Sequence, residues 1–200
     1  MLVRRTEIRE EIRKQRVAGR AALSPEERQA ADRKMAGLLF SCREWKVAET
    51  VFCYVSFRNE ADTFRIIRET LRCGKKAAVP RVEGKHRREF YYIHSMDELS
   101  PGYMGIPEPF GEAGRKAIPG KNDLVVMPGA AFDRSGTRLG YGAGFYDAYL
   151  SKYPDCRRLA LAYSVQIEET IPPESHDIPA EMIITEKGMI RCPQDFREIR

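Results

Sequence analysis

The sequence predicts an α/β fold: a single-domain, open and mostly parallel sheet flanked by helices on both faces. Apolar runs of strand length recur along the chain, and segments with helical periodicity lie between them. A strand–helix–strand order over residues 50–80 predicts a parallel pair, because parallel neighbours need a crossover connection. The 200 residues, of which 42% are hydrophobic, can build one core, so residues 1–200 are expected to form one domain.

Four segments are expected to be helices. Residues 4–22 have a helical pattern, and in Ser24-Pro25-Glu26-Glu27 the serine predicts an N-cap and Glu27 a capping box. The helix after it carries apolar residues at helical spacing: Ala31, Met35, Leu38 and Leu39. Residues 62–73 form another amphipathic pattern with Gly74 as C-terminal cap, and a last helix is expected at about Phe145–Lys152.

The expected strands are short apolar runs: residues 50–56, 76–80, 89–94, 123–128, 158–164 and 181–186. The stretch between them at 102–121 is rich in glycine and proline and is expected to be a loop. Structureless segments of this length are uncommon in compact domains and are often functional.

Composition limits the cell compartment and the class of partner. Five scattered cysteines without a C-x-x-C pair argue against a disulfide framework and a zinc site, so a cytoplasmic protein with reduced thiols is expected. No apolar run is long enough for a membrane span, and the charged N-terminal stretch does not have the apolar centre of a secretory signal. The net charge of +5 fits an anionic ligand, although many ordinary proteins are mildly basic.

The glycine loop, GTRLGYGAGFYD at 136–147, lies between a predicted strand and a predicted helix. In such a turn, backbone N–H groups can approach a phosphate, and the helix N-terminus adds partial positive charge. The loop matches neither the dinucleotide fingerprint nor the Walker P-loop. A series of turns that need positive φ explains the glycines equally well.

Two charged residues of the glycine loop favour the phosphate interpretation. The planar guanidinium of Arg138 suits phosphate oxygens. Asp147 lies in the first turn of the expected helix, where it either interacts with the helix dipole or holds a Mg²⁺ ion bound to phosphate.

The N-terminal helix carries an arginine stripe on one face: Arg5, Arg9, Arg13, Arg16 and Arg20. Glu7, Glu10 and Glu11 are expected to lie off this face, so the like charges need partners from elsewhere. An anionic ligand, carboxylates of neighbouring elements and nucleic-acid phosphates are the three candidates.

The segment MPGAAFDRSGTRLGYGAGFYDAYL, residues 127–150, resembles the signature of the 5-formyltetrahydrofolate cyclo-ligase family, also called 5,10-methenyltetrahydrofolate synthetases. Three further segments are similar to that family: R-x-x-I-R from Arg9 to Arg13, YVSFRNEADT at 54–63 and HDIPAEMIITE at 176–186. The resemblance spans essentially the whole chain and implies the open α/β sheet of ribose-5-phosphate isomerases and CoA transferases.

The reaction implied by this resemblance converts 5-formyltetrahydrofolate and ATP into 5,10-methenyltetrahydrofolate, ADP and phosphate, with Mg²⁺ required. The formyl oxygen attacks the γ-phosphate, and nitrogen 10 of the folate then closes the ring and expels phosphate. The substrate supplies both nucleophiles, so the enzyme needs positioning and charge stabilisation instead of a serine or cysteine nucleophile. The implied partners are ATP and 5-formyltetrahydrofolate, with or without a polyglutamate tail, bound by a monomer, with neither nucleic acid nor membrane involved.

The resemblance also implies site residues. The ATP-binding residues are Arg9, Arg13, Arg138, Leu139, Gly140, Tyr141, Gly142, Ala143, Gly144, Phe145 and Tyr146. The folate-binding residues are Val55, Glu60, Ile106, Pro107, Tyr141, Gly142, Ala143, Gly144 and Phe145, with Glu60 bonded to pterin N–H groups. The Mg²⁺ ligands are Asp147 and Glu181.

Two positions depart from the family pattern. Ala143 stands where relatives often carry lysine or glycine, which removes one phosphate contact and leaves more of the grip to Arg138 and the helix arginines. Glu181 follows Pro-Ala where many relatives have aspartate after Pro-Val, so a carboxylate is retained with a longer reach.

Two other functions compete with the cyclo-ligase interpretation. A nucleic-acid-binding module would use the basic helix for phosphates and the aromatic residues near the glycines for stacking, but the usual motifs are absent from the sequence. A related α/β enzyme acting on a sugar phosphate would need no Mg-ATP.

Overall fold

A computed structural model describes residues 2–84 and 87–193. The helices are α1 (Leu2–Ala21), α2 (Pro25–Ser41), α3 (Arg43–Val47), α4 (Phe64–Arg72) and α5 (Phe145–Leu150). The main sheet contains β1 (Thr50–Cys53), β2 (Lys76–Glu83), β3 (Arg87–Ile93), β6 (Lys116–Ala117), β7 (Leu124–Met127), β10 (Arg157–Leu161), β12 (Met182–Thr185) and β13 (Gly188–Arg191). Two small sheets contain β8 (Ala131–Asp133), β9 (Arg138–Leu139) and β11 (Ile167–Glu168), and β4 (Leu99–Pro101) and β5 (Pro107–Pro109).

The eight strands of the main sheet have the order β13-β12-β10-β7-β1-β2-β3-β6, and those from β12 to β2 are parallel. Antiparallel pairs extend both ends, where β13 joins β12 and where β3 and β6 follow β2. Every residue of β1 and β7 is buried, as expected for central strands covered on both faces. The predicted open, mostly parallel sheet is therefore confirmed.

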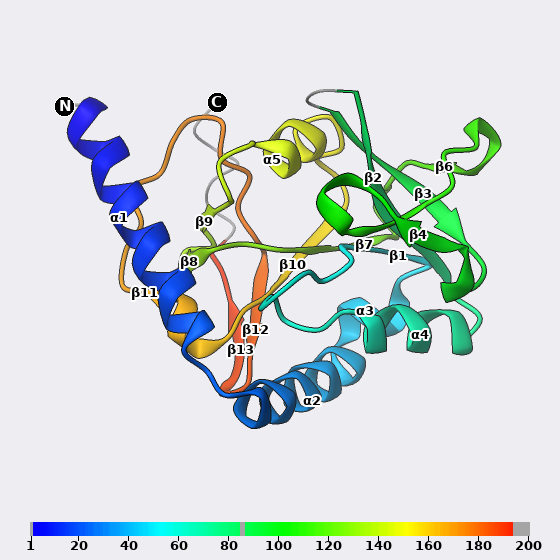
Figure 1. The fold of residues 1–200 in the computed structure, drawn as a ribbon, viewed down its shortest axis with the longest axis horizontal. Helices are drawn as coiled ribbons and strands as arrows, with labels where there is room; N and C mark the ends of the chain where they lie inside the picture. Colours follow the sequence, from blue (N-terminus) through cyan, green and yellow to red (C-terminus); the bar gives the residue numbers. More distant parts are fainter. Residues whose placement is uncertain (1, 85–86, 194–200) are drawn as a thin grey trace.

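Helices cover both faces of this sheet. Figure 1 shows α2, α3 and α4 below the sheet and α5 above it. Met35 and Leu39 of α2 and Ile66 and Ile67 of α4 supply fully buried side chains to the core. On the other face, Tyr149 of α5 packs on Phe90 of β3 with ring centroids 5.0 Å apart. The residues that directly follow β1 and β7 border the same space as the glycine loop.

The predicted helix boundaries are largely confirmed. Ser24 and Glu27 form the capping box of α2, with reciprocal hydrogen bonds to backbone N–H groups. Gly74 adopts a φ of 73° directly after the C-cap of α4, a conformation that favours glycine. The strand expected at 50–56 ends at Cys53, because the following residues enter a loop that hydrogen bonds between Ser56 and Thr63 close.

The segment 102–121 is more ordered than a simple loop. It contains β5, β6 and the 3₁₀ turns η2 (Tyr103–Gly105) and η3 (Ala113–Arg115), while η1 (Met96–Glu98) precedes it and η4 (Ser164–Gln166) lies later in the chain. Strands β4 and β5 pair antiparallel, so η2 is the tip of a hairpin. The expectation of a structureless loop is therefore wrong, and the reason is pairing between short segments that have no periodic signal.

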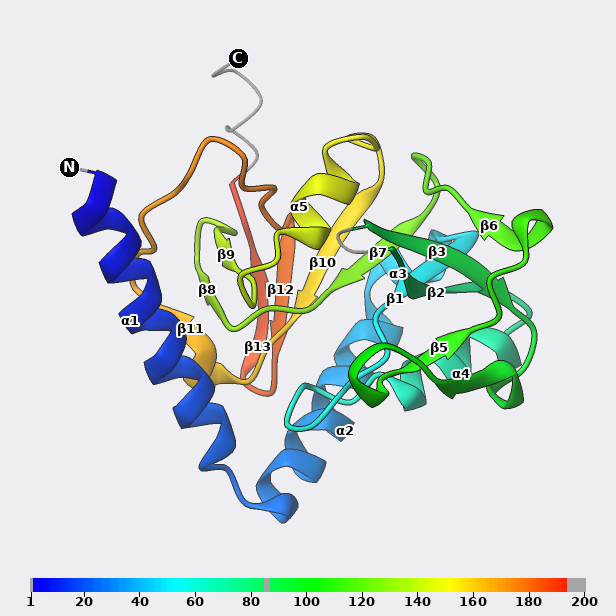
Figure 2. The same cartoon turned by 45° about the horizontal axis from the view of Figure 1, so that its top comes forward.

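Helix α1 stands apart from the main sheet. Figure 2 shows it running along β8 and β11, which belong to the smaller three-stranded sheet. Ile12 of α1 packs against a second apolar cluster formed by Ala131, Leu139 and Ile171. Few of its side chains are buried, so polar contacts must hold much of this helix in place.

Two compositional expectations can be compared with the structure. All five cysteines are free thiols, four of them buried and Cys73 exposed. Within residues 2–84 and 87–193, no helix combines the length and the hydrophobicity that a membrane crossing needs.

Candidate active site

The glycine loop lies between β9 and the first turn of α5. Gly142 and Gly144 have φ values of 103° and 62°, which side-chain-bearing residues adopt only at a cost. Gly144 is the N-cap of α5 and has no side chain to cap it, so the first N–H groups of this helix lack the usual capping side chain. The turn and phosphate-cradle interpretations are therefore compatible, because the turns themselves present the N–H groups.

Two cavities meet at this loop. The larger has a volume of about 560 Å³ and is bordered by the loop after β1, the β4–β5 hairpin tip and α5. The smaller, of about 150 Å³, lies between α1, the glycine loop and residues 174–177. Arg138, Gly140, Gly144 and Asp147 line both cavities. The two cavities therefore adjoin across this shared wall.

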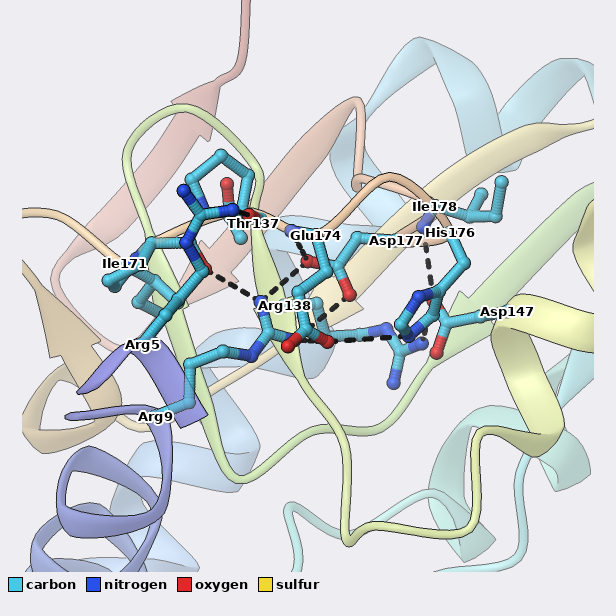
Figure 3. Close-up of polar contacts among 12 residues, drawn as sticks. Arg5, Arg9, Thr137, Arg138, Asp147, Ile171, Glu174, His176, Asp177 and Ile178 are labelled. Carbon is cyan, nitrogen blue, oxygen red and sulfur yellow. Dashed lines mark hydrogen bonds and ion pairs between the residues drawn. The ribbon is translucent and has the colours of Figure 1, made fainter. Parts of the chain in front are cut away.

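Arg138 and Asp147 form the centre of the shared wall. Arg138 is 3% exposed, and its Nη2 lies 2.7 Å from Asp147 Oδ1. The same carboxylate oxygen accepts a hydrogen bond of 3.0 Å from the backbone N–H of Ile178, as Figure 3 shows. Asp147 is thus fixed from two sides and ties α5 to the segment at 172–178.

The larger cavity contains buried polar groups that need a partner. Among the residues that the structure describes, Arg20 Nε, Arg138 Nε and Tyr146 Oη are buried side-chain atoms that make no hydrogen bond. All three residues line this cavity. Because an unsatisfied buried polar atom is costly, their presence indicates a site built for a polar ligand.

Glu60 is the acidic group aimed at this cavity from the loop after β1. Its Oε2 accepts a hydrogen bond of 3.0 Å from the backbone N–H of Phe57. Tyr54 Oη donates to the carbonyl of Ala61 at 2.9 Å, which fixes the loop from beneath. Burial raises the pKa of the Glu60 carboxyl, while the Phe57 amide and Tyr141 act in the opposite direction.

Glu60→Gln is expected to be more stable than the wild type at pH 7. When folding raises the pKa of a carboxyl group, the protein becomes less stable as the pH rises from the pKa in the unfolded chain, 4.5, through the pKa in the folded protein. Glutamine retains the acceptor for Phe57 without the charge, so the advantage should shrink as the pH falls below 4.5. Thermal unfolding midpoints at pH 7 and pH 4 measure this difference. A variant less stable than the wild type at pH 7 would contradict the burial argument.

Arg9 and Asp177, which form an ion pair, both line the smaller cavity. Arg9 of α1 is 7% exposed and binds Asp177 through two hydrogen bonds of 2.7 and 2.9 Å (Figure 3). It also donates to the carbonyl of Pro172 at 2.7 Å, and Glu174 lies 3.7 Å from its second amino nitrogen. Glu174, His176 and Asp177 present ligand atoms within 4.8 Å of one another. The carboxylate oxygens of Glu174 and Asp177 are donors of the kind that suit Mg²⁺.

The arginine stripe of α1 binds groups of the chain itself. Arg9 and Arg16 pair with the carboxylates of Asp177 and Glu168, which come from other elements. Arg13 donates to the carbonyl of Gly140 at 2.9 Å and also pairs with Glu10, three residues earlier on α1. The remaining two contacts are Arg5 to the Pro173 carbonyl and Arg20 to the Tyr141 hydroxyl. The stripe thus holds α1 against the site, which weakens the nucleic-acid interpretation.

Most of the site residues predicted from the sequence line a cavity. Those around the larger cavity are Val55, Glu60, Ile106, Arg138, Gly140, Tyr141, Ala143, Gly144, Phe145, Tyr146 and Asp147. Those around the smaller cavity are Arg9, Arg13, Arg138, Gly140, Gly142, Gly144 and Asp147. The structure therefore brings residues from α1, the loop after β1, the hairpin and the glycine loop to one place.

Three predicted site residues line neither cavity. Leu139 is fully buried in the second apolar cluster, and Pro107 lies in the hairpin strand β5 beside the lining residue Ile106. Glu181 binds Arg158 at 2.8 Å, next to the first residues of β10 and β12, and lines neither cavity. The structure does not bring Glu181 to Asp147.

The prediction omitted several residues that line the cavities: Arg20, Arg58, Arg88, Glu174, His176 and Asp177. Asp177 and His176 belong to the segment HDIPAE, which carries part of the family resemblance and from which Glu181 was chosen as the metal ligand. One signal could have identified Asp177. The arginine stripe needs negatively charged partners, and Asp177 is a carboxylate in a segment that resembles the family.

Comparison with known proteins gives a consistent result. The model of the 5-formyltetrahydrofolate cyclo-ligase family matches residues 5–186. The Escherichia coli K12 5-formyltetrahydrofolate cyclo-ligase is 30% identical over 171 residues, which cover 83% of this chain and 93% of that protein. The mitochondrial 5-formyltetrahydrofolate cyclo-ligase of Arabidopsis thaliana is 31% identical over 195 residues, covering 84% and 70%. The NMR structure of Aquifex aeolicus 5,10-methenyltetrahydrofolate synthetase superposes with a TM-score of 0.82 at 34% identity, covering 96% of each chain.

Proposed function

Because the chain belongs to the 5-formyltetrahydrofolate cyclo-ligase family, we propose that it closes 5-formyltetrahydrofolate to 5,10-methenyltetrahydrofolate in an ATP-dependent reaction. The observation that carries the proposal is the shared wall of Arg138, Gly140, Gly144 and Asp147 between two cavities. The shared wall puts the two cavities next to each other, as transfer of a phosphoryl group from ATP to a folate requires.

The larger cavity is assigned to the folate. Its volume of about 560 Å³ falls within the range of about 300–1,000 Å³ that is usual for small-molecule sites. Glu60 is the acceptor for the pterin N–H groups, with Val55 as the apolar wall beneath, because both lie on the same loop at the end of β1. Ile106 covers the ligand from the hairpin side, and Tyr141 to Phe145 border it from the glycine loop.

The smaller cavity is assigned to the phosphates of ATP. A volume of about 150 Å³ is too small for a whole nucleotide, so the base and ribose lie outside it. Arg9, Arg13 and Arg138 supply positive charge around this space, and the N–H groups of the glycine loop supply donors. This assignment leaves Leu139 as a core residue that supports the loop.

The residues that would hold Mg²⁺ are the carboxylates along the smaller cavity. We propose Asp147 together with Asp177 and Glu174, because all three border this space and offer the hard oxygen donors that Mg²⁺ prefers. The proposal leaves out Glu181, because it does not border this space. The ion, when bound, would neutralise phosphate charge.

The chemistry proceeds in two displacements. The formyl oxygen forms a bond to the γ-phosphorus as the bond to ADP breaks. Nitrogen 10 then forms a bond to the formyl carbon, the carbon–oxygen bond breaks, and phosphate leaves with that oxygen while nitrogen 10 loses its proton. The proposed role of Arg138, which borders both cavities, is electrostatic stabilisation of the charge that develops on the transferred phosphate.

The proposal is tested by mixing purified protein, 5-formyltetrahydrofolate and Mg-ATP and recording the absorbance of the methenylfolate product. The assay is then repeated with each component omitted in turn. A rise that requires all three supports the proposal. No rise from folded protein that still binds ATP would leave a phosphate site and move the function to another acceptor, such as a sugar phosphate.

The monomeric state and the cytoplasmic location stay predictions. Gel filtration and fractionation of the source cells test them independently of activity. The same holds for the single-domain organisation, which limited proteolysis tests because a second unit would be released as a stable fragment.

A further inference from the structure

Two residues share an unusual backbone conformation at the mouth of the larger cavity. Arg58 has a φ of 54° and Met104 a φ of 56°, and these are the non-glycine residues with positive φ within residues 2–84 and 87–193. A side chain in this region crowds its own backbone, which costs free energy that glycine avoids. Both residues line the larger cavity, although they come from different loops.

The two residues belong to neighbouring loops. Figures 1 and 2 show the turn after β1 and the tip of the β4–β5 hairpin side by side. Met104 is 65% exposed, and its neighbour Tyr103, also at the cavity, is 53% exposed. Arg58 is exposed and stacks on Phe57 at 5.1 Å, and among the described residues it has neither an ion pair nor a hydrogen bond. Packing within the protein therefore does not explain either side chain.

Strained positions that could carry glycine but hold long side chains point to a ligand. We propose that Arg58 and Met104, the rim pair, bind the p-aminobenzoylglutamate half of the folate, an inference that rests on the proposed function. Met104 packs its thioether on the benzoyl ring, and Arg58 binds a glutamate carboxylate.

The outer half of the substrate is assigned to the rim pair because the residues at the cavity mouth are exposed, whereas those of the inner part are more buried. Val55, which is 3% exposed, and the partly buried Glu60 border the inner part, where the pterin is placed. The other half of the folate extends outward from the pterin and reaches exposed residues. Its aromatic ring and carboxylates match one apolar and one cationic partner.

The experiment uses alanine and glycine at each rim position. Alanine removes the side chain beyond Cβ and keeps the strain of the positive φ, whereas glycine removes both the side chain and the strain. Ile118→Ala and Arg65→Ala are the matched controls, because both residues are exposed and line neither cavity. Each protein is assayed with 5-formyltetrahydrofolate and with 5-formyltetrahydropteroate, which has no glutamate.

Met104→Ala should raise the KM for both folate substrates about fivefold, the scale of a partly buried side chain. Arg58→Ala should raise the KM about tenfold for the glutamate form only, as expected for a lost charged hydrogen bond. The KM for ATP should not change. Each glycine variant should melt about 2–4 °C above its alanine counterpart, because the strain is released.

Unchanged folate KM values in both alanine variants would overturn the proposal, as would equal changes in the KM for ATP. An Arg58→Ala penalty that persists with the pteroate substrate would overturn the carboxylate assignment. A wild-type enzyme without methenyl product would refute the proposed function instead. Calorimetric binding of 5-formyltetrahydrofolate to the same variants would then still test the rim pair.

Discussion

Asp147→Asn is expected to lower turnover about 100- to 1,000-fold, the scale of removing one group that stabilises charge in a transition state. Asparagine retains an oxygen that can accept from Arg138 and from the Ile178 N–H, so the fold around α5 should persist. The lost charge should weaken the Mg²⁺ dependence, because a neutral amide is a poorer ligand for a hard cation. Turnover measured across a magnesium titration gives both effects.

Asp155→Asn is the matched control for this substitution. Asp155 is exposed and lines neither cavity, so its amide variant should behave as the wild type does. Activity of Asp147→Asn equal to that of the wild type at every magnesium concentration would remove Asp147 from the metal site.

Arg138→Ala is expected to weaken ATP binding by about 1.5–3 kcal/mol, which raises the KM for ATP roughly 10- to 150-fold. The buried guanidinium also pairs with Asp147, and breaking a buried pair costs about 3–5 kcal/mol of unfolding free energy. Arg138→Lys separates the two effects, because lysine retains the charge beside Asp147 and loses the planar fork. The KM values for ATP and folate and the unfolding midpoint are measured for both variants.

Arg134→Ala is the matched control, because Arg134 is exposed and lines neither cavity. An increase confined to the KM for folate would contradict the assigned role of Arg138 in the phosphate cavity. Loss of stability without any change in either KM would make Arg138 a purely structural residue.

The order of the longer elements could be predicted from the sequence because each carries its own signal. The capping box at Ser24 and the apolar runs at β1, β7, β10 and β12 are local patterns, and parallel pairing follows from the connections. The small sheet of β8, β9 and β11 could not be predicted. Its strands have two or three residues each, and tertiary contacts decide whether such segments pair.

The site was predictable where it follows one motif and not where distant segments meet. Arg138 and Asp147 are nine residues apart, and both lie in the glycine motif. Arg9 and Asp177 are 168 residues apart, and no periodicity connects them. Glu181 was chosen from the same C-terminal segment by analogy, whereas the strand that begins at Met182 turns its carboxylate toward Arg158.

The contacts of α1 also fix when the site can form during synthesis. The ribosome releases α1 before its partners: Arg9 binds Asp177 across 168 residues, and Arg16 binds Glu168 across 152. Domains generally fold as units, and these contacts close loops that span most of the chain, so they cannot form until the later segments have been made. The Arg9 contacts of α1 therefore cannot form until the segment at 172–177 has been translated, so a nascent chain arrested before that point contains the glycine loop but lacks one wall of the smaller cavity.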